Sequence, residues 1–277
     1  MIQRTQQVLR GRTAIVTGAS SGIGRAIAEQ LGAAGAHVFL VGRRVEPMEA
    51  TRSQIIGDGG DATVVQADVR SPAAVRGIVD RAVAETGTLN IMVNNAGVYD
   101  PASICEGDPE NWLAMLETNI LAVLVGCQAA VRAMRAIKAE GHIVNIASNA
   151  AQRRDSGVYG STKHAVDSIS GSLRNELEGD TIRVTNILPG IYATNLSRDW
   201  DPAFVQGLLD RAGIDHRVVR GEYLPEDVLT HLKGPMRQIM GDPADVARAV
   251  FYAVTQPIDV NVLDICIRPP KRIDLPG

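Results

Sequence analysis

Short runs of β-branched and apolar residues alternate along the chain with longer stretches in which apolar positions recur at helical spacing. Seven such runs lie at residues 13–17, 37–41, 62–66, 89–94, 142–147, 181–188 and 261–267. This alternation is typical of βαβ units, in which helices join parallel strands and cover both faces of one sheet. The runs are continuously apolar, as expected for parallel strands that are buried on both faces. The pattern therefore predicts an α/β fold with seven strands.

The stretch between the first two runs predicts an amphipathic helix. Ile23, Ile27 and Leu31 recur every fourth residue, so they form one apolar stripe that can pack on the sheet. Gly35 follows, and a glycine at this place supplies the left-handed turn that ends many helices. We therefore expect the helix to end close to Gly35.

No Pro/Gly/Ser-rich linker, repeat or low-complexity tract divides the 277 residues, so we expect one domain over residues 1–277. Residues 195–240 interrupt the strand–helix rhythm between the sixth and seventh runs. Open α/β sheets place ligand-covering segments after the carboxyl ends of strands. We interpret residues 195–240 as a substrate lid that contains short helices.

Composition indicates a soluble globular protein, because 45% of the residues are hydrophobic and 21% are charged. Residues 1–12 lack the continuous apolar segment of a secretory signal, and no run of about eighteen apolar residues suggests a membrane span. Cys105, Cys127 and Cys266 are far apart, which argues against disulfides and a zinc site and fits a reducing cytoplasm. We interpret Cys105 and Cys127 as inert core thiols. A net charge of −3 without a long basic run argues against nucleic acid as the partner.

A glycine-rich turn, T-G-x-x-x-G-x-G, joins the first predicted strand to the first helix. Gly18, Gly22 and Gly24 permit a tight turn, a close approach of backbone to ligand, and packing of the helix on the strand. The free N–H groups and the dipole of the helix then favour a pyrophosphate. The spacing differs from the commoner G-x-G-x-x-G, so a purely structural turn is the alternative to a dinucleotide site.

The end of the second run distinguishes the two nicotinamide cofactors. Enzymes that prefer NAD usually carry an acidic residue here for the ribose 2′-hydroxyl, whereas an arginine accommodates the 2′-phosphate of NADP. This chain has Gly42 followed by Arg43 and Arg44, so the sequence favours NADP over NAD. The alternative is that the two arginines only begin a solvated helix.

Tyr159 and Lys163 are four residues apart, which places them on one face of a helix. A free tyrosine has a pKa near 10, and a neighbouring ammonium lowers it by stabilising the phenolate. Tyr159 can then exchange a proton with an alcohol or carbonyl while hydride moves to or from a nicotinamide. Such pairs also occur by chance, and the glycine-rich turn in the same chain is what favours the catalytic interpretation.

These residues together resemble the short-chain dehydrogenases/reductases, in their shorter form with the cofactor segment first. The matching pieces follow the family order over nearly the whole chain: "TGASSGIG" (17–24), "DV" (68–69), "NNAG" (94–97), "TN" (118–119), "IVNIAS" ending at Ser148, "YGSTK" (159–163) and "PGIYAT" (189–194). The resemblance implies a doubly wound sheet in the order 3-2-1-4-5-6-7, and assembly as a homotetramer or homodimer.

The resemblance also implies roles for individual residues. Tyr159 would be the acid/base, Ser148 would hydrogen-bond the substrate oxygen, and Lys163 would bind the nicotinamide ribose. Asn119 would hold the helix distortion and water of a proton relay. Asp68 would contact the adenine, and Thr194 the region of the carboxamide. The complete set implied for the cofactor is Gly18, Ser20, Ser21, Gly22, Ile23, Gly24, Arg43, Arg44, Asp68, Val69, Asn95, Ala96, Gly97, Tyr159, Lys163, Pro189, Gly190, Ile191 and Thr194.

Two departures from the family pattern bear on the site. The loop between Ser148 and Tyr159 is slightly shorter than usual, which affects one pocket wall. The position before Gly22, often basic in NADP users, is Ser21, so Arg43 alone carries the NADP argument.

The substrate is the least determined feature. Residues 244–269 resemble a subgroup of NADP-dependent enzymes that act on 3-hydroxy acids such as serine, but this segment belongs to the scaffold. Pocket candidates are Tyr99, residues 149–157 and the lid residues Trp200, Phe204 and Tyr223. Candidates for a carboxylate clamp are Arg153, Arg154, His216 and Arg217.

We expect an NADP(H)-dependent oxidoreductase that interconverts a secondary alcohol or hydroxy acid with its carbonyl form. One alternative is a protein that binds or senses NADP(H) without chemistry. Another is an epimerase or dehydratase on the same fold.

Overall fold

Seven parallel strands form one sheet in the order β3-β2-β1-β4-β5-β6-β7 in the computed structural model, which describes residues 7–271. The strands are β1 (Thr13–Thr17), β2 (His37–Gly42), β3 (Asp61–Gln66), β4 (Ile91–Asn94), β5 (Gly141–Ile146), β6 (Ile182–Pro189) and β7 (Asp264–Ile267). The ends of each strand differ by at most one residue from the ends of a predicted run, or the strand lies inside the run. The predicted fold class and strand order are confirmed. The prediction for residues 1–12 falls partly outside the described residues.

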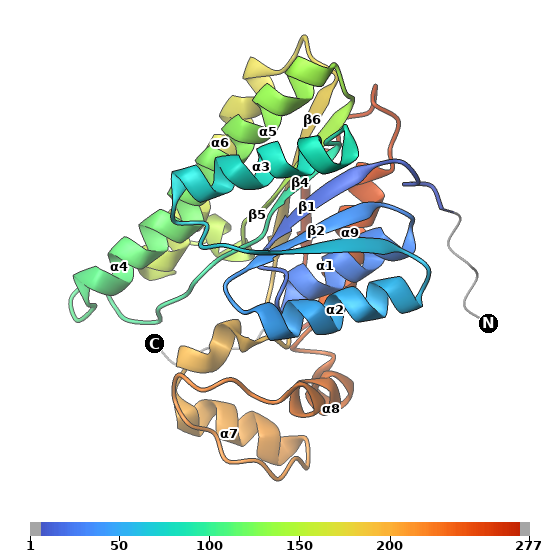
Figure 1. Ribbon diagram of the computed structural model, residues 1–277. Helices are drawn as coiled ribbons and strands as arrows, with labels where there is room; N and C mark the ends of the chain where they lie inside the picture. The colour runs from blue at the N-terminus through green and yellow to red at the C-terminus, as the bar shows by residue number, and fades with distance from the viewer. Residues whose placement is uncertain (1–6, 272–277) are drawn as a thin grey trace.

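Helices cover both faces of the sheet (Figure 1). One face carries α3 (Pro72–Thr86), α5 (Ala122–Ile137) and α6 (Gly157–Glu176), and the other carries α1 (Gly22–Ala33), α2 (Val45–Gly57) and α9 (Pro243–Val254). Each set of helices packs on the sheet through its own core cluster. The alternation is visible in β1, where Ile15 points into one cluster and its neighbours Ala14 and Val16 point into the other.

The first helix follows its sequence signals. Ile27 and Leu31 are fully buried, and Ile23 packs against the same cluster from a half-buried position. The helix ends at Ala33, and Gly35 adopts the left-handed conformation with φ of 94°. Its amide donates to the Gly32 carbonyl, which completes the predicted turn.

The two edge strands are less buried than the runs of apolar residues predict. In β7, Asp264 and Cys266 are exposed, and in β3 both terminal residues are exposed. An edge strand has a neighbour on one side only, so its burial depends on what covers it as well as on its sequence. Continuous apolar character was therefore a sound guide to the five inner strands and a weaker one at the edges.

The long rod on the first face contains a helix distortion. It consists of α4 (Pro109–Leu116), a π-helical turn η1 (Glu117–Leu121) and α5. Residues Pro109–Ile137 are long and apolar enough, by length and composition only, to cross a membrane, and half of their most apolar window is buried inside the fold. The α5 part packs against α3 and β4, as a core helix of a soluble protein also does.

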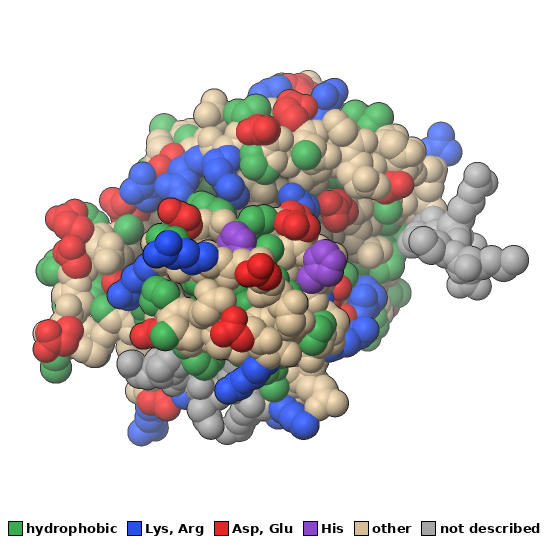
Figure 2. All heavy atoms as spheres, turned by 90° about the horizontal axis from the view of Figure 1, so that it is seen from below, with side chains coloured by type: hydrophobic (Ala, Val, Ile, Leu, Met, Phe, Trp, Pro, Cys, Tyr) green, Lys and Arg blue, Asp and Glu red, His purple; other side chains and the backbone are tan. Residues whose placement is uncertain are grey.

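Residues 195–240 contain η3 (Asn195–Asp199, a 3₁₀ turn), α7 (Pro202–Arg211) and α8 (Glu226–Met236), in agreement with the expectation of short helices. They form the lowest part of the molecule in Figure 1 and have a small apolar cluster of their own that includes Leu209 and Leu232. Figure 2 views the molecule from this side, where basic and acidic side chains lie interspersed. We refer to residues 195–240 as the lid segment.

Candidate active site

The four residues expected to act on a substrate lie on neighbouring elements. Ser148 lies two residues after the end of β5, Tyr159 and Lys163 lie one turn apart on α6, and Asn119 lies in η1, which contacts α6. All four side chains are buried, with exposures between 0 and 9%. Lys163 therefore does not extend into bulk water.

Burial dominates the acidity of the Tyr159 phenol. It raises the pKa of Tyr159 to about 12, while a hydrogen bond from Ser148 acts in the opposite direction by favouring the phenolate. The Tyr99 ring packs edge-on against Tyr159, with ring centroids 4.9 Å apart, and excludes water from this side. The phenol is therefore protonated at neutral pH in this structure, and the expected depression of its pKa by Lys163 is not observed.

Lys163 is held away from the phenol by the backbone. Its Nζ donates a hydrogen bond to the Ile146 carbonyl at 2.9 Å and lies 5.8 Å from the centroid of the Tyr159 ring. Burial lowers the pKa of Lys163 to about 8. Within residues 7–271 the Lys163 ammonium makes this one hydrogen bond, so its other N–H groups can donate to a further partner.

Asn119 connects the π turn to the loop after β4. Its Oδ1 accepts a hydrogen bond from the Val98 amide, and its Nδ2 donates to the Val98 carbonyl, both at 2.9 Å. Nδ2 also donates to the Thr162 hydroxyl at 3.0 Å, and that hydroxyl donates to the Tyr159 carbonyl. Asn119 thus orients both the loop and the helix that carries Tyr159. Thr162 was not identified from the sequence, although it lies inside the "YGSTK" motif.

The glycine-rich turn has the geometry expected of a phosphate cradle. Gly18 and Gly22 have φ of 69° and 54°, in the left-handed region that side chains disfavour. A Cβ on Gly22 would lie 2.9 Å from the methyl group of Thr194, so the turn and the loop after β6 are in contact. Ser21, at the N-cap of α1, makes no side-chain capping bond, which leaves the first N–H groups of the helix without a side-chain acceptor.

Thr17 ties this turn to the loop after β4. Its hydroxyl accepts hydrogen bonds from the amides of Asn95 and Ala96, each at 3.0 Å, and donates to the Val93 carbonyl. The Asn95 side chain returns a bond to the Thr17 carbonyl at 2.8 Å. Thr17 is the first residue of the "TGASSGIG" motif, but it was assigned no role from the sequence, because its partners come from the loop after β4.

The remaining residues predicted for the cofactor lie at or after the carboxyl ends of their strands. Asp68 forms a two-pronged ion pair with Arg70 that lowers the pKa of its carboxyl group, so this side chain already has a partner. Arg43 is exposed, and Arg44 begins α2. Pro189 is the last residue of β6, and Ile23 and Gly24 lie in the first turn of α1. The others are on the loops after β1, β3, β4 and β6: Ser20, Val69, Gly97, Gly190 and Ile191.

The aromatic pocket candidates separate into two places. Tyr99 contacts Tyr159. Burial raises the pKa of Tyr99, and a hydrogen bond with Trp200 partly opposes this rise. Trp200 in turn packs against Phe204 at 5.9 Å. Tyr223 lies elsewhere, against the guanidinium of Arg44. The structure therefore brings Tyr99, and through it Trp200, to Tyr159, and places Tyr223 beside Arg44 after β2.

Two other expectations can be assessed. Cys127 is buried and its pKa is raised to about 12 by burial, as an inert core thiol requires. Cys105 is exposed on the loop after β4, so its assignment to the core was wrong. Among the candidates for a carboxylate clamp, Arg153, Arg154 and Arg217 are exposed and His216 is half-buried. Arg153 is paired with Asp155.

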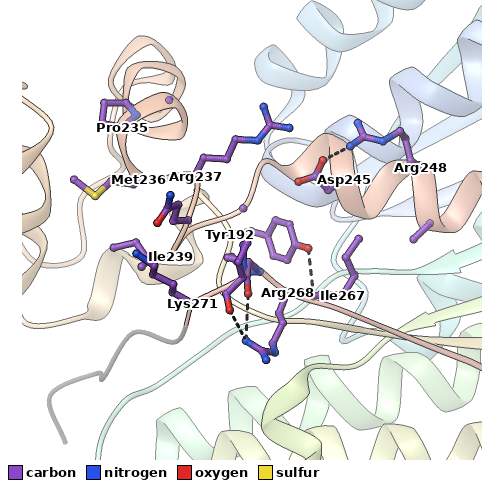
Figure 3. Close-up of a pocket in the computed structure, with 16 residues that line it drawn as sticks. Tyr192, Pro235, Met236, Arg237, Ile239, Asp245, Arg248, Ile267, Arg268 and Lys271 are labelled. Carbon is purple, nitrogen blue, oxygen red and sulfur yellow. Dashed lines mark hydrogen bonds and ion pairs between the residues drawn. The ribbon is translucent and has the colours of Figure 1, made fainter.

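A cavity of about 960 Å³ lies away from these residues, between α8, α9 and β7 (Figure 3). The ring of Tyr192 lines it, and the Tyr192 hydroxyl donates to the Ile267 carbonyl. Arg268 turns its guanidinium to the carbonyls of Pro269 and Pro270. None of the four expected catalytic residues lines this cavity.

Comparison with known proteins identifies the family. Residues 12–203 match the model of the short chain dehydrogenase family. An uncharacterized oxidoreductase of Staphylococcus aureus is 33% identical over 264 residues, covering 95% of this chain and 99% of that protein. The chain belongs to the short-chain dehydrogenase family. A second uncharacterized oxidoreductase of this kind, from Staphylococcus saprophyticus, is 35% identical over 265 residues, covering 94% of this chain and 98% of the other.

Solved structures of short-chain dehydrogenases have the same fold. A Burkholderia cenocepacia short chain dehydrogenase in complex with NADP has a TM-score of 0.74 at 31% identity, covering 94% of this chain and 97% of that one. A metagenomic short-chain oxidoreductase in complex with NADP has a TM-score of 0.73 at 28% identity, covering 95% and 99%. An alcohol dehydrogenase of Thermococcus sibiricus, complexed with 5-hydroxy-NADP, has a TM-score of 0.77 at 22% identity, covering 95% and 99%, a likeness of fold. The chain is thus an oxidoreductase of the short-chain dehydrogenase family.

Proposed function

We propose that the protein interconverts a secondary alcohol or hydroxy acid with its carbonyl form, using NADP(H). The observation that carries this proposal is the buried arrangement of Ser148, Tyr159 and Lys163 beside a glycine-rich turn. The NADP complexes of similar short-chain dehydrogenases support the choice of cofactor.

The residues present fit a dinucleotide. Gly18 and Gly22 expose backbone where a side chain would collide with Asn95 or Thr194. Arg43 and Arg44 make no side-chain hydrogen bond or ion pair within residues 7–271, so their donors are available to a phosphate. When bound, the nicotinamide supplies the hydride acceptor or donor of the reaction.

The protein side chains handle the proton. In the reducing direction the Tyr159 hydroxyl donates its proton to the carbonyl oxygen of the substrate, and Ser148 donates a hydrogen bond to the same oxygen. In the oxidising direction Tyr159 must first lose its proton. The positive charge of the Lys163 ammonium favours that loss, against the burial that raises the pKa of Tyr159. Asn119 is a positioning residue, because it holds the helix turn that carries Tyr159.

The test is turnover of a panel of ketones, aldehydes and hydroxy acids, followed through the absorbance of the reduced nicotinamide with NADP(H) and NAD(H) in parallel. Tyr159→Phe removes only the transferable proton, so we expect kcat to fall at least about 100-fold. The dissociation constant for NADP⁺ should stay within about twofold of wild type. Tyr252→Phe, on the exposed face of α9, serves as the control.

Unchanged turnover in Tyr159→Phe would remove the proposed mechanism. NADP⁺ binding without turnover on any substrate would favour a sensing protein. Isomerisation without net change in nicotinamide absorbance would favour an epimerase.

We further propose that the chain assembles as a homodimer or homotetramer. Exposed leucines follow the rod formed by α4, η1 and α5: Leu113, Leu116, Leu121 and Leu124 are each between 40 and 49% exposed. An apolar row of this kind on a surface helix is typical of a subunit contact.

A further inference from the structure

One lid residue lies against the segment expected to select the cofactor. The Tyr223 ring has the guanidinium carbon of Arg44 at 4.1 Å from its centroid and that of Arg198 at 5.3 Å. Arg44 follows β2, whereas Arg198 and Tyr223 belong to the lid segment. Two cations that are far apart in sequence are thus gathered on a single aromatic ring, where the ring quadrupole attracts both.

The position of Tyr223 is fixed by residues that follow Thr194 in the chain. Asn195 follows Thr194 directly; its Oδ1 accepts from the Leu224 amide at 2.8 Å and its Nδ2 donates to the Leu224 carbonyl at 3.2 Å. The Gly221 amide donates to the Arg198 carbonyl at 2.9 Å. These three bonds hold the backbone on both sides of Tyr223 against η3. The lid segment is also joined to α1 by an ion pair between Glu226 and Arg25 at 3.0 Å.

The stacked guanidinium retains its hydrogen-bonding capacity. A guanidinium interacts with a ring through its face, while its N–H donors point outward in its own plane. Within residues 7–271 the Arg44 side chain has no hydrogen bond or ion pair, so all its donors are available. One Arg198 nitrogen donates to the Asn195 carbonyl at 3.2 Å. A second nitrogen lies 3.5 Å from the Asp199 carboxylate. An in-plane fork of this kind matches a phosphate group.

The balance of charge at this place favours an anion. Asp199 and Glu226 are the acids of the lid segment that pair here, each with an arginine. Arg43 and Arg44 are adjacent, and Arg43 also lowers the pKa of Asp68. Ser21 adds no cation here, whereas the lid segment brings Arg198 to the same ring as Arg44.

We propose that the lid segment recognises the 2′-phosphate of NADP(H): Arg198 supplies a further cation beside Arg43 and Arg44, and Tyr223 is the positioning residue that orients Arg44 and Arg198. This inference rests on the proposed NADP(H) dependence and adds a selectivity determinant outside the glycine-rich turn and β2. It gives the lid segment a role at the adenosine end of the cofactor as well as over the substrate.

The experiment measures binding to the purified full-length protein by titration calorimetry, without any substrate. The probes are NADP⁺, NAD⁺, and the fragments 2′,5′-ADP and 5′-AMP, which differ only in the 2′-phosphate. Tyr223→Ala and Arg198→Ala should each weaken NADP⁺ and 2′,5′-ADP about tenfold, which corresponds to about 1.4 kcal/mol. Binding of NAD⁺ and 5′-AMP should change less than about twofold. Tyr223→Phe keeps the ring and should restore tight binding.

Matched controls separate this effect from a general loss of lid structure. Tyr252→Ala removes an exposed tyrosine from α9, and Arg211→Ala removes an exposed arginine from the end of α7. Both should bind the four probes as wild type does. The proposal is overturned if Tyr223→Ala or Arg198→Ala weakens NADP⁺ and NAD⁺ equally, or weakens neither. The proposed cofactor fails separately if the wild-type protein binds NAD⁺ as tightly as NADP⁺.

Discussion

Three buried asparagines occupy the same register on neighbouring strands. Asn94 pairs with Asn145, and Asn145 with Asn186. The Asn94 side chain donates to Asn145 Oδ1 at 2.8 Å, and Asn145 donates to the Ser170 hydroxyl of α6 at 3.0 Å. All four side chains are at most 4% exposed. Asn186 instead donates to Asp167 at 2.8 Å, and its buried Oδ1 has no partner within residues 7–271. Each bond of the chain from Asn94 to Ser170 matters, because an unpaired buried polar group loses its hydration without replacement.

Asn145→Ala should therefore lower the free energy of unfolding by about 2–4 kcal/mol, since it removes the 2.8 Å acceptor of Asn94 and the donor to Ser170 and opens a cavity. Asn94 then keeps a 3.4 Å contact with Cys127 Sγ, and Ser170 keeps its bond to the Val166 carbonyl. Urea denaturation measures the change. Asn175→Ala, at an exposed position of α6, should stay within about 0.5 kcal/mol of wild type. Equal effects of the two substitutions would show that the chain of asparagines contributes nothing specific.

At the residue scale the sequence predicted that Tyr159 and Lys163 lie close together, but it did not predict their pKa values. Tyr159 and Lys163 had to share a helix face, because four residues make about one turn. Their pKa values depend on the Tyr99 ring, the Ile146 carbonyl and the exclusion of water, which come from distant parts of the chain. The asparagine row escaped notice for the same reason, since strand register decides which side chains are neighbours.

At the scale of elements, the rod of α4, η1 and α5 combines a buried distortion with an exposed apolar row. Asn119 faces inward within η1, whereas Leu116 and Leu124 face solvent on either side of the turn. The helical pattern of the sequence predicted a helix here, and only the family resemblance pointed to a distortion. A π turn inserts one residue without a residue-type signature, so hydrophobic periodicity does not locate it.

If the leucine row is a subunit contact, the double substitution Leu116→Glu and Leu124→Glu should convert the assembly to monomers, because two buried carboxylates would lose their hydration. Light scattering coupled to size-exclusion chromatography gives the mass directly. Replacement of Val260 and Leu263, exposed near β7, by glutamate is the comparison. A wild-type protein that is already monomeric would refute the proposed assembly.

At the scale of the whole molecule, strand order and lid placement could not be derived from periodicity. The order 3-2-1-4-5-6-7 followed from the family resemblance, because local patterns do not specify which distant strands pair. The interrupted rhythm predicted the short helices of residues 195–240, yet the contacts of this segment with Arg44 and Arg25 were not foreseen. Those contacts depend on how the segment folds back over α1 and β2, which no local signal encodes.

The stability of the whole molecule should depend on pH through one buried histidine. Burial, with Arg12 and Arg183 nearby and only Glu140 opposing them, lowers the pKa of His142 from 6.5 to about 4. The unfolded chain therefore binds a proton first, so the stability present above pH 6.5 is lost as the pH falls toward 4. Between about pH 7 and about pH 4.5 this amounts to about 2 kcal/mol.

His142→Gln should reduce that acid-induced loss by about the same 2 kcal/mol, measured as the difference in unfolding free energy between the two pH values. His231→Gln, at an exposed position on α8, should keep the wild-type loss. A His142→Gln variant that loses as much stability in acid as wild type would assign the acid sensitivity to other groups.

The hydrogen bonds of Thr17 have a consequence for the ligand. The Thr17 hydroxyl joins the glycine-rich turn to the loop after β4, whose Gly97 lies beside Lys163. The turn and this loop therefore cannot move apart independently. If the protein binds the proposed dinucleotide, this fixed spacing would select the length of its phosphate bridge: a bridge one phosphate longer or shorter would place one ring correctly and displace the other.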